Sequence, residues 1–250
     1  MALALIGADE RPRVTLMTAL PLVWGEGDAA DIVQGRSGRS ETLKIIETTF
    51  DVRPIDILSA KTLGRDIAII AQPRRLTPTE LVVFDKWVRR GGRAMIFADP
   101  ELVWPSRYPP GDNRRAPPVE LLDPLFTHWG IALGDSDRQE RVISINNAAV
   151  KMLAAGAWTG PKTCTAVVPE VLDCRIGNGR VLLVGDADLL DARLWAGRDA
   201  DNASWVVNRL QLLSGFDGRG STRLSGALIG GIIAAAAAIG VFIYHGLVRT

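Results

Sequence analysis

Three aspartates in this sequence stand directly after short apolar runs, where a carboxylate could take part in chemistry. Asp99 follows the run in "GGRAMIFADP", and Asp186 and Asp188 follow the run in "GRVLLVGDAD". Both stretches share one pattern, which is Gly-Arg, five mostly apolar residues and then an acid. Because Mg²⁺ and Ca²⁺ take several oxygen ligands, the three carboxylates could converge on one such ion. We favour the competing interpretation, in which they cap the turns that follow.

The chain offers few groups for acyl transfer, which needs a Ser or Cys nucleophile on a sharp turn and a His base. Its two histidines are His128, in an amphipathic segment, and His245, close to the C-terminus. In "AIIAQPRR", Gln72 stands where the nucleophile of a strand-to-helix elbow would be. We therefore predict no catalytic residue, no metal site and no cofactor. The alternative function is a hydrolase or metal-dependent enzyme that uses the Asp-rich edge.

The chain contains two cysteines, Cys164 and Cys174, ten residues apart in "CTAVVPEVLDC". Two thiols are too few for a disulfide framework or a four-thiolate zinc site. A hairpin could bring them together. We nevertheless expect two unlinked, partly buried thiols, because free cysteine behaves as a small apolar residue.

Two loops at the same expected edge carry aromatic and charged side chains suited to binding. "PLVWGEGD" holds Trp24 and Glu26, and "LVWPSRYPPGDNRR" holds Trp104. Aromatic and arginine side chains are preferred anchors of protein interfaces. The alternative is that the tryptophans pack these loops onto the domain. The candidate residues of this binding edge are Trp24, Glu26, Asp99, Trp104, Asp186 and Asp188.

Alternating strands and helices must position these side chains. "DIAIIAQP" and "RAMIFAD" are continuous apolar runs bounded by breakers, which is typical of strands covered on both faces. Between them, Thr77 predicts an N-cap, Pro78 a first helical position and Glu80 a capping box. Strand, helix and strand at this spacing form a crossover unit that gathers the carboxyl ends of strands at one edge. We therefore predict an α/β fold with an open, mostly parallel sheet flanked by helices.

Composition indicates a globular chain and argues against one class of partner. Of the 250 residues, 47% are hydrophobic and 23% are charged, which is ordinary for a folded domain. The 29 basic and 28 acidic residues leave a net charge of +1. This balance gives no reason to expect a nucleic-acid partner.

Residues 224–248 form an uncharged apolar stretch. At a rise of about 1.5 Å per residue, it is long enough to cross a hydrocarbon core of about 30 Å. We expect one C-terminal transmembrane helix there, in contact with the lipid bilayer of a bacterial-type inner (plasma) membrane. It would follow an N-terminal tail (1–12), an α/β domain (13–215) and a linker (216–223). The side of the membrane that carries the α/β domain is left open.

The order of motifs along the chain is similar to a known family. "LTPTELVVFDKWVRRGGRAMIFADP" resembles the helix, Gly-Gly turn and strand closing in Asp-Pro of the accessory domain of GldG-like, gliding-motility-associated ABC transporters. "LLDPLFTHWGIAL", "GNGRVLLVGDADLL" and "NASWVVNRLQLLSG" resemble its later blocks. The resemblance implies a flavodoxin-like or glutamine-amidotransferase-like domain without known catalysis. It also implies work beside ABC transporter subunits, so we expect a membrane-anchored, non-catalytic accessory or binding subunit.

Overall fold

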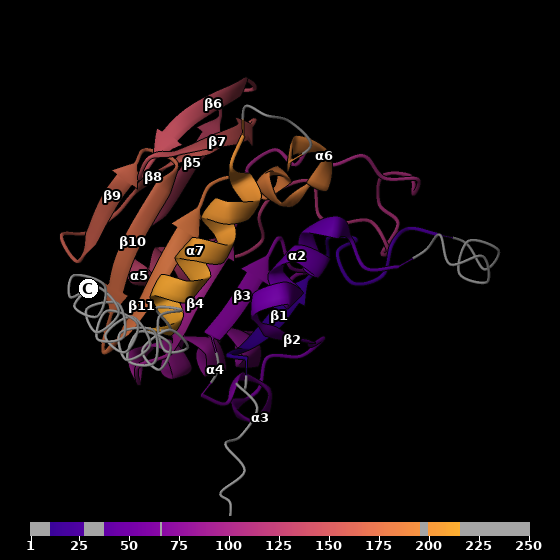
Figure 1. Cartoon of the computed structure of the whole chain (residues 1–250). Coiled ribbons are helices and arrows are strands. Elements are labelled where there is room, and N and C mark those ends of the chain that lie inside the picture. Colours follow the sequence, from indigo (N-terminus) through magenta and orange to yellow (C-terminus); the bar gives the residue numbers. More distant parts are fainter. Residues whose placement is uncertain (1–10, 28–37, 66, 196–199, 216–250) are drawn as a thin grey trace, which may run out of the picture. The chain divides into compact units, whose positions relative to one another are not determined.

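A seven-stranded sheet organises the domain in this computed structural model (Figure 1). The structure describes residues 11–27, 38–65, 67–195 and 200–215. The strands of the sheet are β1 (Arg13–Thr18), β2 (Asp51–Pro54), β3 (Ile67–Ala71), β4 (Arg93–Phe97), β9 (Cys164–Val168), β10 (Val171–Ile176) and β11 (Gly179–Val184). Their order across the sheet is β2-β1-β3-β4-β11-β10-β9. Strands from the first and last thirds of the chain therefore share one sheet.

The predicted fold class, a mostly parallel sheet with an added transmembrane helix, is wrong. The sheet is mixed, because β10 pairs antiparallel with both β11 and β9, while the other pairs are parallel. Short turns at Pro169–Glu170 and Gly177–Asn178 join these three strands. Parallel neighbours would need a crossover of about a dozen residues or more, so such turns allow only antiparallel pairing.

The part of the chain that the structure describes contains no helix long and apolar enough to cross a membrane. The predicted membrane-crossing segment (224–248) and the predicted linker (216–223) lie outside the described residues. By its internal contacts the chain divides into units 1–214 and 215–250, and everything below concerns the first unit.

The start of α4 confirms the cap predicted from the sequence, and α2 begins at a cap of the same kind. In α2 (Glu41–Thr49), the Ser40 side chain accepts a hydrogen bond from the backbone N–H of Leu43. In α4 (Pro78–Arg89), Thr77 and Glu80 form both bonds of a capping box. Each cap satisfies backbone N–H groups that a helix leaves unpaired at its start, so each helix begins directly after its capping residue.

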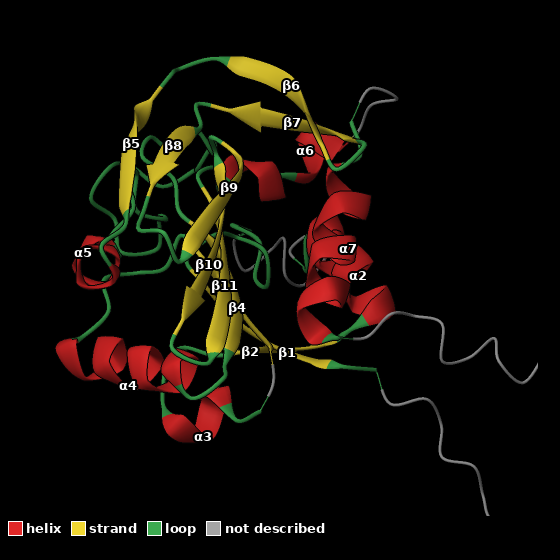
Figure 2. Ribbon diagram, turned by 90° about the vertical axis from the view of Figure 1, so that its left-hand side faces the viewer, coloured by secondary structure: helices red, strands yellow, loops and turns green. Residues whose placement is uncertain are grey.

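Helices cover both faces of the sheet and give three layers (Figure 2). One face carries α3 (Ala60–Leu63), α4 and α5 (Asp123–Trp129), and the other carries α2 and α7 (Asn202–Ser214). Each interface has its own apolar core. In β3, for example, Ile69 packs into the core beneath α2 and α7, whereas Ile70 packs into the core beneath α4 and α5. Successive strand residues point to opposite faces, so a buried strand must be apolar throughout.

Two short antiparallel pairs lie beside the main sheet. β5 (Ala132–Ser136) pairs with β8 (Gly156–Thr159), and β6 (Glu140–Ile145) pairs with β7 (Ala148–Leu153). The turn of the second pair, Asn146–Asn147, has φ values of 53° and 67°. Asparagine tolerates this left-handed conformation, which two-residue hairpins require. A 3₁₀ turn, η1 (Asp188–Leu190), and a short helix, α6 (Ala192–Trp195), connect β11 to α7.

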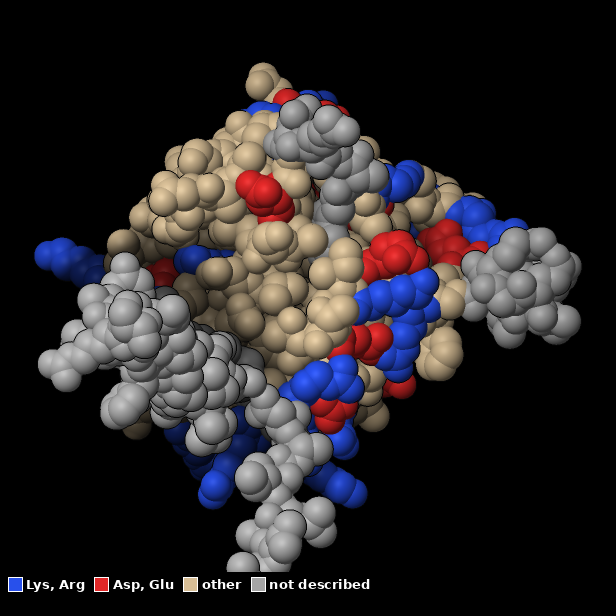
Figure 3. Space-filling view, in the orientation of Figure 1, with Lys and Arg blue, Asp and Glu red and all other residues tan. Residues whose placement is uncertain are grey.

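The face covered by α2 and α7 differs in charge from one side to the other. Charged side chains of both signs gather over and beside α2, whereas the visible surface over α7 is largely uncharged (Figure 3).

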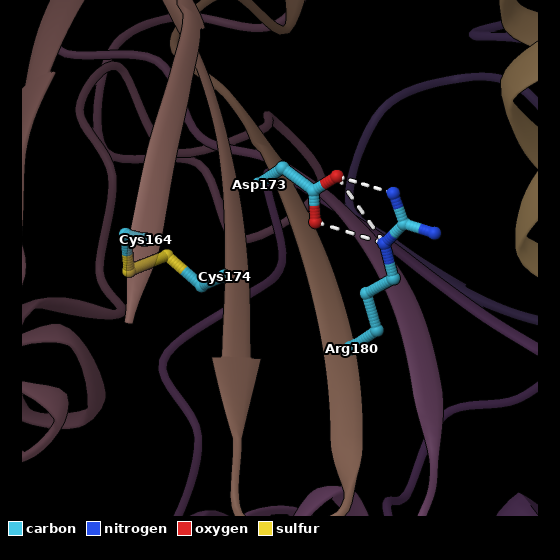
Figure 4. The surroundings of a disulfide bond; sticks show 4 residues. All are labelled: Cys164, Asp173, Cys174 and Arg180. Atoms are coloured by element: carbon cyan, nitrogen blue, oxygen red, sulfur yellow. Dashed lines mark hydrogen bonds and ion pairs between the residues drawn. A yellow bond between two sulfur atoms is a disulfide. The ribbon is translucent and has the colours of Figure 1, made fainter. Parts of the chain in front are cut away.

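The cysteine prediction is also wrong, because Cys164 and Cys174 form a disulfide (Figure 4). The two residues stand directly opposite each other in the β9–β10 register, with their Cα atoms 4.0 Å apart. Cross-strand neighbours in an antiparallel pair are close enough for such a bond. The disulfide therefore fastens the edge strand β9 to the rest of the sheet.

Candidate functional site

An open groove of about 480 Å³ lies at the carboxyl ends of β1 and β2. The turn after β1 begins with the backbone N–H of Leu20 bonded to the Thr18 hydroxyl, and the chain then passes through Trp24 to Glu26. The far wall includes Ile55 and Asp56, which follow β2. In sheets with parallel strands, ligands bind outside the carboxyl ends of the strands. The groove therefore lies at the position where this architecture places binding sites.

Aromatic and charged side chains line this groove. Trp24 is 82% exposed, although it is one of the largest apolar side chains in the domain. Tyr108 and Arg114 line the groove, and the Arg114 guanidinium lies 4.1 Å from the centre of the Tyr108 ring. Asp112 holds Arg114 with a bond of 2.7 Å between Oδ2 and Nη2. An exposed tryptophan beside a stacked arginine and tyrosine is the composition of a protein-binding surface.

Two distant loops contact each other at Glu26, which lines the groove. The backbone N–H of Arg107 donates to the Glu26 carboxylate, and the Arg107 guanidinium donates to the Glu26 carbonyl, both at 2.6 Å. Glu26 therefore lines the groove and also holds the long loop after β4 against the turn after β1. Trp104, in the same long loop, is half-buried and packs against the core beneath α2 and α7.

Asp99, Asp186 and Asp188 form a separate, buried cluster. Each offers a carboxylate oxygen within 4.8 Å of the others, and none of the three side chains is more than 1% exposed. The strand register explains why these carboxylates lie close together. β4 and β11 are parallel neighbours in which Arg93 lies opposite Arg180. The acids that end the two strands are therefore brought together.

The carboxylates of this cluster are occupied by backbone N–H groups. The donors are Glu101, Ala187 and Asp188 to Asp99, Leu153 and Leu189 to Asp186, and Val103 to Asp188. These donors belong to the loop after β4, to the end of β7 and to the turn around η1. The cluster therefore fastens three segments to the edge of the sheet, and in this geometry its oxygens act as caps.

Burial makes the cluster retain protons. Removal from water raises the pKa of Asp99 to about 6 and that of Asp188 to about 7, with the neighbouring carboxylates adding to the effect. Burial, followed by the charge of Asp99, raises the pKa of Asp186 well above its ordinary value. Carboxyl groups this close disfavour each other's ionisation. The folded state is therefore more stable when the carboxyl groups of this cluster are protonated and uncharged.

The structure separates the six predicted edge residues into different settings. Trp24 and Glu26 line the groove, Trp104 packs beneath a loop, and the three aspartates lie in the buried cluster. His128 lies away from this edge on α5, where its Nε2 is 3.7 Å from the Asp85 carboxylate.

Asp56 and Arg114 also line the groove, although neither is among the residues predicted from the sequence. The strand order explains the position of Asp56. Because β2 lies directly beside β1, the residues that follow the two strands meet at the groove. Arg114 lies at the groove because it stacks on Tyr108, and the spacing of these residues along the chain does not reveal that contact.

Comparison with protein families gives a match to the family described as "ABC-type uncharacterized transport system", over residues 11–161. The match covers more than half of the chain. The chain belongs to this family. The predicted resemblance to an ABC transporter accessory domain is therefore confirmed, and the chain has an accessory role in ABC-type transport.

One solved structure agrees with the fold but adds nothing on activity. The mmIFT52 N-terminal domain is similar over 81% of this chain and 97% of that chain, with 14% identity and a TM-score of 0.53. Exo-beta-1,4-mannosidase Op5Man5 from Opitutaceae bacterium strain TAV5 is similar over 82% of this chain, with 16% identity and a TM-score of 0.48. This chain spans only 36% of that enzyme. No curated protein matches the chain.

Proposed function

We propose that this chain is a non-catalytic binding subunit that docks a polypeptide of an ABC-type transport system in the groove at the ends of β1 and β2. The observation that carries the proposal is Trp24, which is 82% exposed at a groove of about 480 Å³. A large exposed aromatic side chain has a free-energy cost in water that a partner surface removes. The adjacent Tyr108 and Arg114 supply further anchors of the kind found at interface hot spots.

The setting of the reactive groups supports a non-catalytic role. The two thiols are joined in a disulfide, so neither can act as a nucleophile. The aspartates of the buried cluster already accept backbone hydrogen bonds, and no substrate can reach carboxylates that are almost wholly buried. In the part of the chain that the structure describes, His128 hydrogen-bonds to no Ser or Cys side chain, and its neighbours are Asp85 and Arg89 on α4.

The same disulfide supports a proposal for the location of the domain. Disulfides persist in oxidising compartments and are rare in the cytosol. We therefore place the domain on the outer side of the plasma membrane, where it would meet the exposed loops of a membrane-bound transporter.

The experiment is co-purification with identification of what is captured. The tagged full chain is purified in mild detergent from membranes of its own organism, and mass spectrometry identifies the partners. We expect an ABC transporter subunit with the wild type, at least a fivefold loss with Trp24→Ala, and no loss with Val82→Ala. Val82 is an exposed apolar residue on α4 and serves as the matched control. Equal capture by wild type and Trp24→Ala, or no transporter subunit in repeated wild-type purifications, contradicts the proposal.

A further inference from the structure

A second open pocket, of about 440 Å³, lies at the edge of the sheet opposite the groove at Trp24. Its walls come from α3 and the turn after it, from the last turn of α4 and from the start of β4, so it lies at the amino ends of β3 and β4. Its volume is within the range of about 300–1,000 Å³ that is usual for small-molecule sites. Four basic side chains line it, which are Arg65, Lys86, Arg90 and Arg93.

The positive charge of this pocket is not balanced within the part of the chain that the structure describes. No described residue that lines the pocket is acidic, and none of the four basic side chains forms an ion pair with a described carboxylate. The two carboxylates of α4 are engaged elsewhere, because Glu80 binds Arg74 and Asp85 binds Arg89. Like charges gathered in one pocket repel one another, and a bound anion would remove that repulsion.

The end of α4 explains only part of this charge. Cations near a helix C-terminus complement the helix dipole, and Lys86 and Arg90 lie there. Arg65 precedes β3 and Arg93 begins β4, so the dipole does not account for either. Three separate segments therefore bring cations to one pocket. Basic side chains also gather along the lower edge of the view in Figure 3, at the end of the domain where Figure 1 places α3 and α4.

One wall of the pocket is apolar and held in place. The Trp87 indole N–H donates to the carbonyl of Gly64 at 3.0 Å, and the ring stacks with Phe84 at a centroid distance of 5.7 Å. Gly92 packs so closely that a Cβ atom there would lie 2.5 Å from the indole ring. The half-buried Val83 continues this wall. A ligand in the pocket therefore meets an apolar surface as well as cations.

These features select a multiply charged anion that carries an apolar group. A carboxylate has one charge, whereas a phosphate monoester has between about 1.5 and 2 at neutral pH and three oxygens that accept hydrogen bonds. Arginine guanidinium groups match the geometry of phosphate oxygens. We propose that this pocket binds a phosphate monoester attached to a short apolar group. The phosphate lies among the four basic side chains, and the apolar group lies against Trp87 and Val83.

The proposal goes beyond the proposed function and concerns the opposite edge of the sheet. The same phosphate group occurs in soluble organic phosphates and in phosphatidic acid, which is a phosphorylated lipid. The test therefore has one arm for each source.

The test is calorimetric titration of the full chain in an uncharged maltoside detergent at pH 8, where a phosphate monoester is a dianion. In the first arm, hexyl phosphate is compared with hexyl sulfate, which has the same shape and one charge fewer. In the second arm, mixed micelles of the detergent with phosphatidic acid are compared with mixed micelles containing phosphatidylglycerol, a phosphate diester with one charge. We expect saturable binding of the monoester and at least tenfold weaker binding of its counterpart.

Matched variants assign the binding to the pocket. Arg90→Gln should weaken binding of the monoester at least tenfold. Arg75→Gln removes the same charge from an exposed arginine before the start of α4, outside the pocket, and should leave binding unchanged. Ala60→Glu places a carboxylate in the pocket at an exposed position, and Ala60→Gln adds a side chain of similar size without charge. The loss should be at least tenfold greater with glutamate, so the test does not depend on Arg90→Gln remaining folded.

The opposite results are equally distinct. The proposal is overturned if neither hexyl phosphate nor phosphatidic acid binds, if each binds no better than its counterpart, or if Arg90→Gln and Arg75→Gln bind equally well. Binding of phosphatidic acid alone supports the site with a lipid as its source, and binding of hexyl phosphate alone supports it with a soluble ligand. If a monoester binds but no transporter subunit co-purifies with the wild type, the proposed function fails while this site stands. If Trp24→Ala abolishes co-purification but no monoester binds, the reverse holds.

Discussion

The side-chain amide of Gln72 hydrogen-bonds to both backbone groups of Asp99. Its Oε1 accepts from the Asp99 N–H at 2.9 Å, and its Nε2 lies 3.4 Å from the Asp99 carbonyl oxygen. Nε2 also donates to the carbonyl of Pro117 at 3.0 Å. Gln72 adopts a left-handed conformation with φ of 39°, which is unfavourable for a residue other than glycine. These bonds hold the strained residue in place, and they fix the loop that forms part of the carboxyl edge.

The first prediction concerns the hydrogen bonds of the Gln72 side chain. Gln72→Ala keeps the strained backbone but leaves buried backbone groups without partners, so we expect a loss of about 2–3 kcal/mol in the free energy of unfolding. Urea denaturation measures the loss. Gln139→Ala, at an exposed position, is the control and should stay within about 0.5 kcal/mol of wild type. Equal stability of the two variants would contradict the role given to Gln72.

The second prediction is that the free energy of unfolding rises as pH falls from 8 to 5. The pKa values of Asp99 and Asp188 are about 6 and 7 in the folded chain. Both lie above the ordinary value for an aspartate, so between these pH values the folded state binds more protons than the unfolded state. The stabilisation is therefore present at low pH and is lost as pH rises through the folded values. Denaturation at a series of pH values measures it.

Asp188→Asn separates this effect from the charge of the whole chain. The asparagine oxygen can still accept from Val103 N–H, but the buried charge is removed. We expect the variant to be about 1 kcal/mol more stable than wild type at pH 8 and to depend less on pH. Asp135→Asn, at an exposed position on β5, should follow the wild-type curve. A wild-type stability that is flat or rises from pH 5 to 8 would exclude the acid cluster as its cause.

Some of this architecture could be predicted from local pattern alone. The repeated Gly-Arg turn, apolar run and acid predicts two buried strands, and equal spacing brings Asp99 and Asp186 together once β4 and β11 pair in register. The capping interpretation of these acids also followed from their positions at strand ends. The caps at Ser40 and Thr77 were predictable because helix capping depends on residues only three apart.

Other features depend on contacts that no local pattern encodes. Glu26, which lines the groove at the carboxyl edge, bonds to Arg107, and the two residues are 81 positions apart in the chain. The sheet ends in antiparallel pairs because β10 lies between β9 and β11. The apolar runs in the sequence do not determine that position. The sequence predicts Trp205 as part of an apolar stripe of a helix. That its indole N–H lacks a hydrogen bond within the described residues follows only from the structure around it.

The third prediction is that Cys164 and Cys174 are joined in the purified protein. Intact mass spectrometry should find no thiol that reacts with an alkylating reagent until a reductant is added. Replacing both residues by serine should lower the free energy of unfolding by about 2–3 kcal/mol, the effect of removing a cross-link that closes a short loop. Two reactive thiols in the unreduced protein, isolated without exposure to reductant, would contradict the bond.

The fourth prediction tests the close approach of β11 to the end of α4. A Cβ atom at Gly179 would lie 2.1 Å from the carbonyl oxygen of Val88 and 2.4 Å from that of Gly92. Both are backbone atoms, so Gly179→Ala must displace β11 or the turn after α4, and we expect a loss of about 2–3 kcal/mol. Gly38→Ala is the matched control, because nothing lies within 4 Å of the added atom. It should be neutral or slightly stabilising, since alanine restricts the unfolded chain. Thermal unfolding of the two variants beside wild type measures the difference, and a Gly179→Ala protein as stable as Gly38→Ala would show that β11 does not pack this closely.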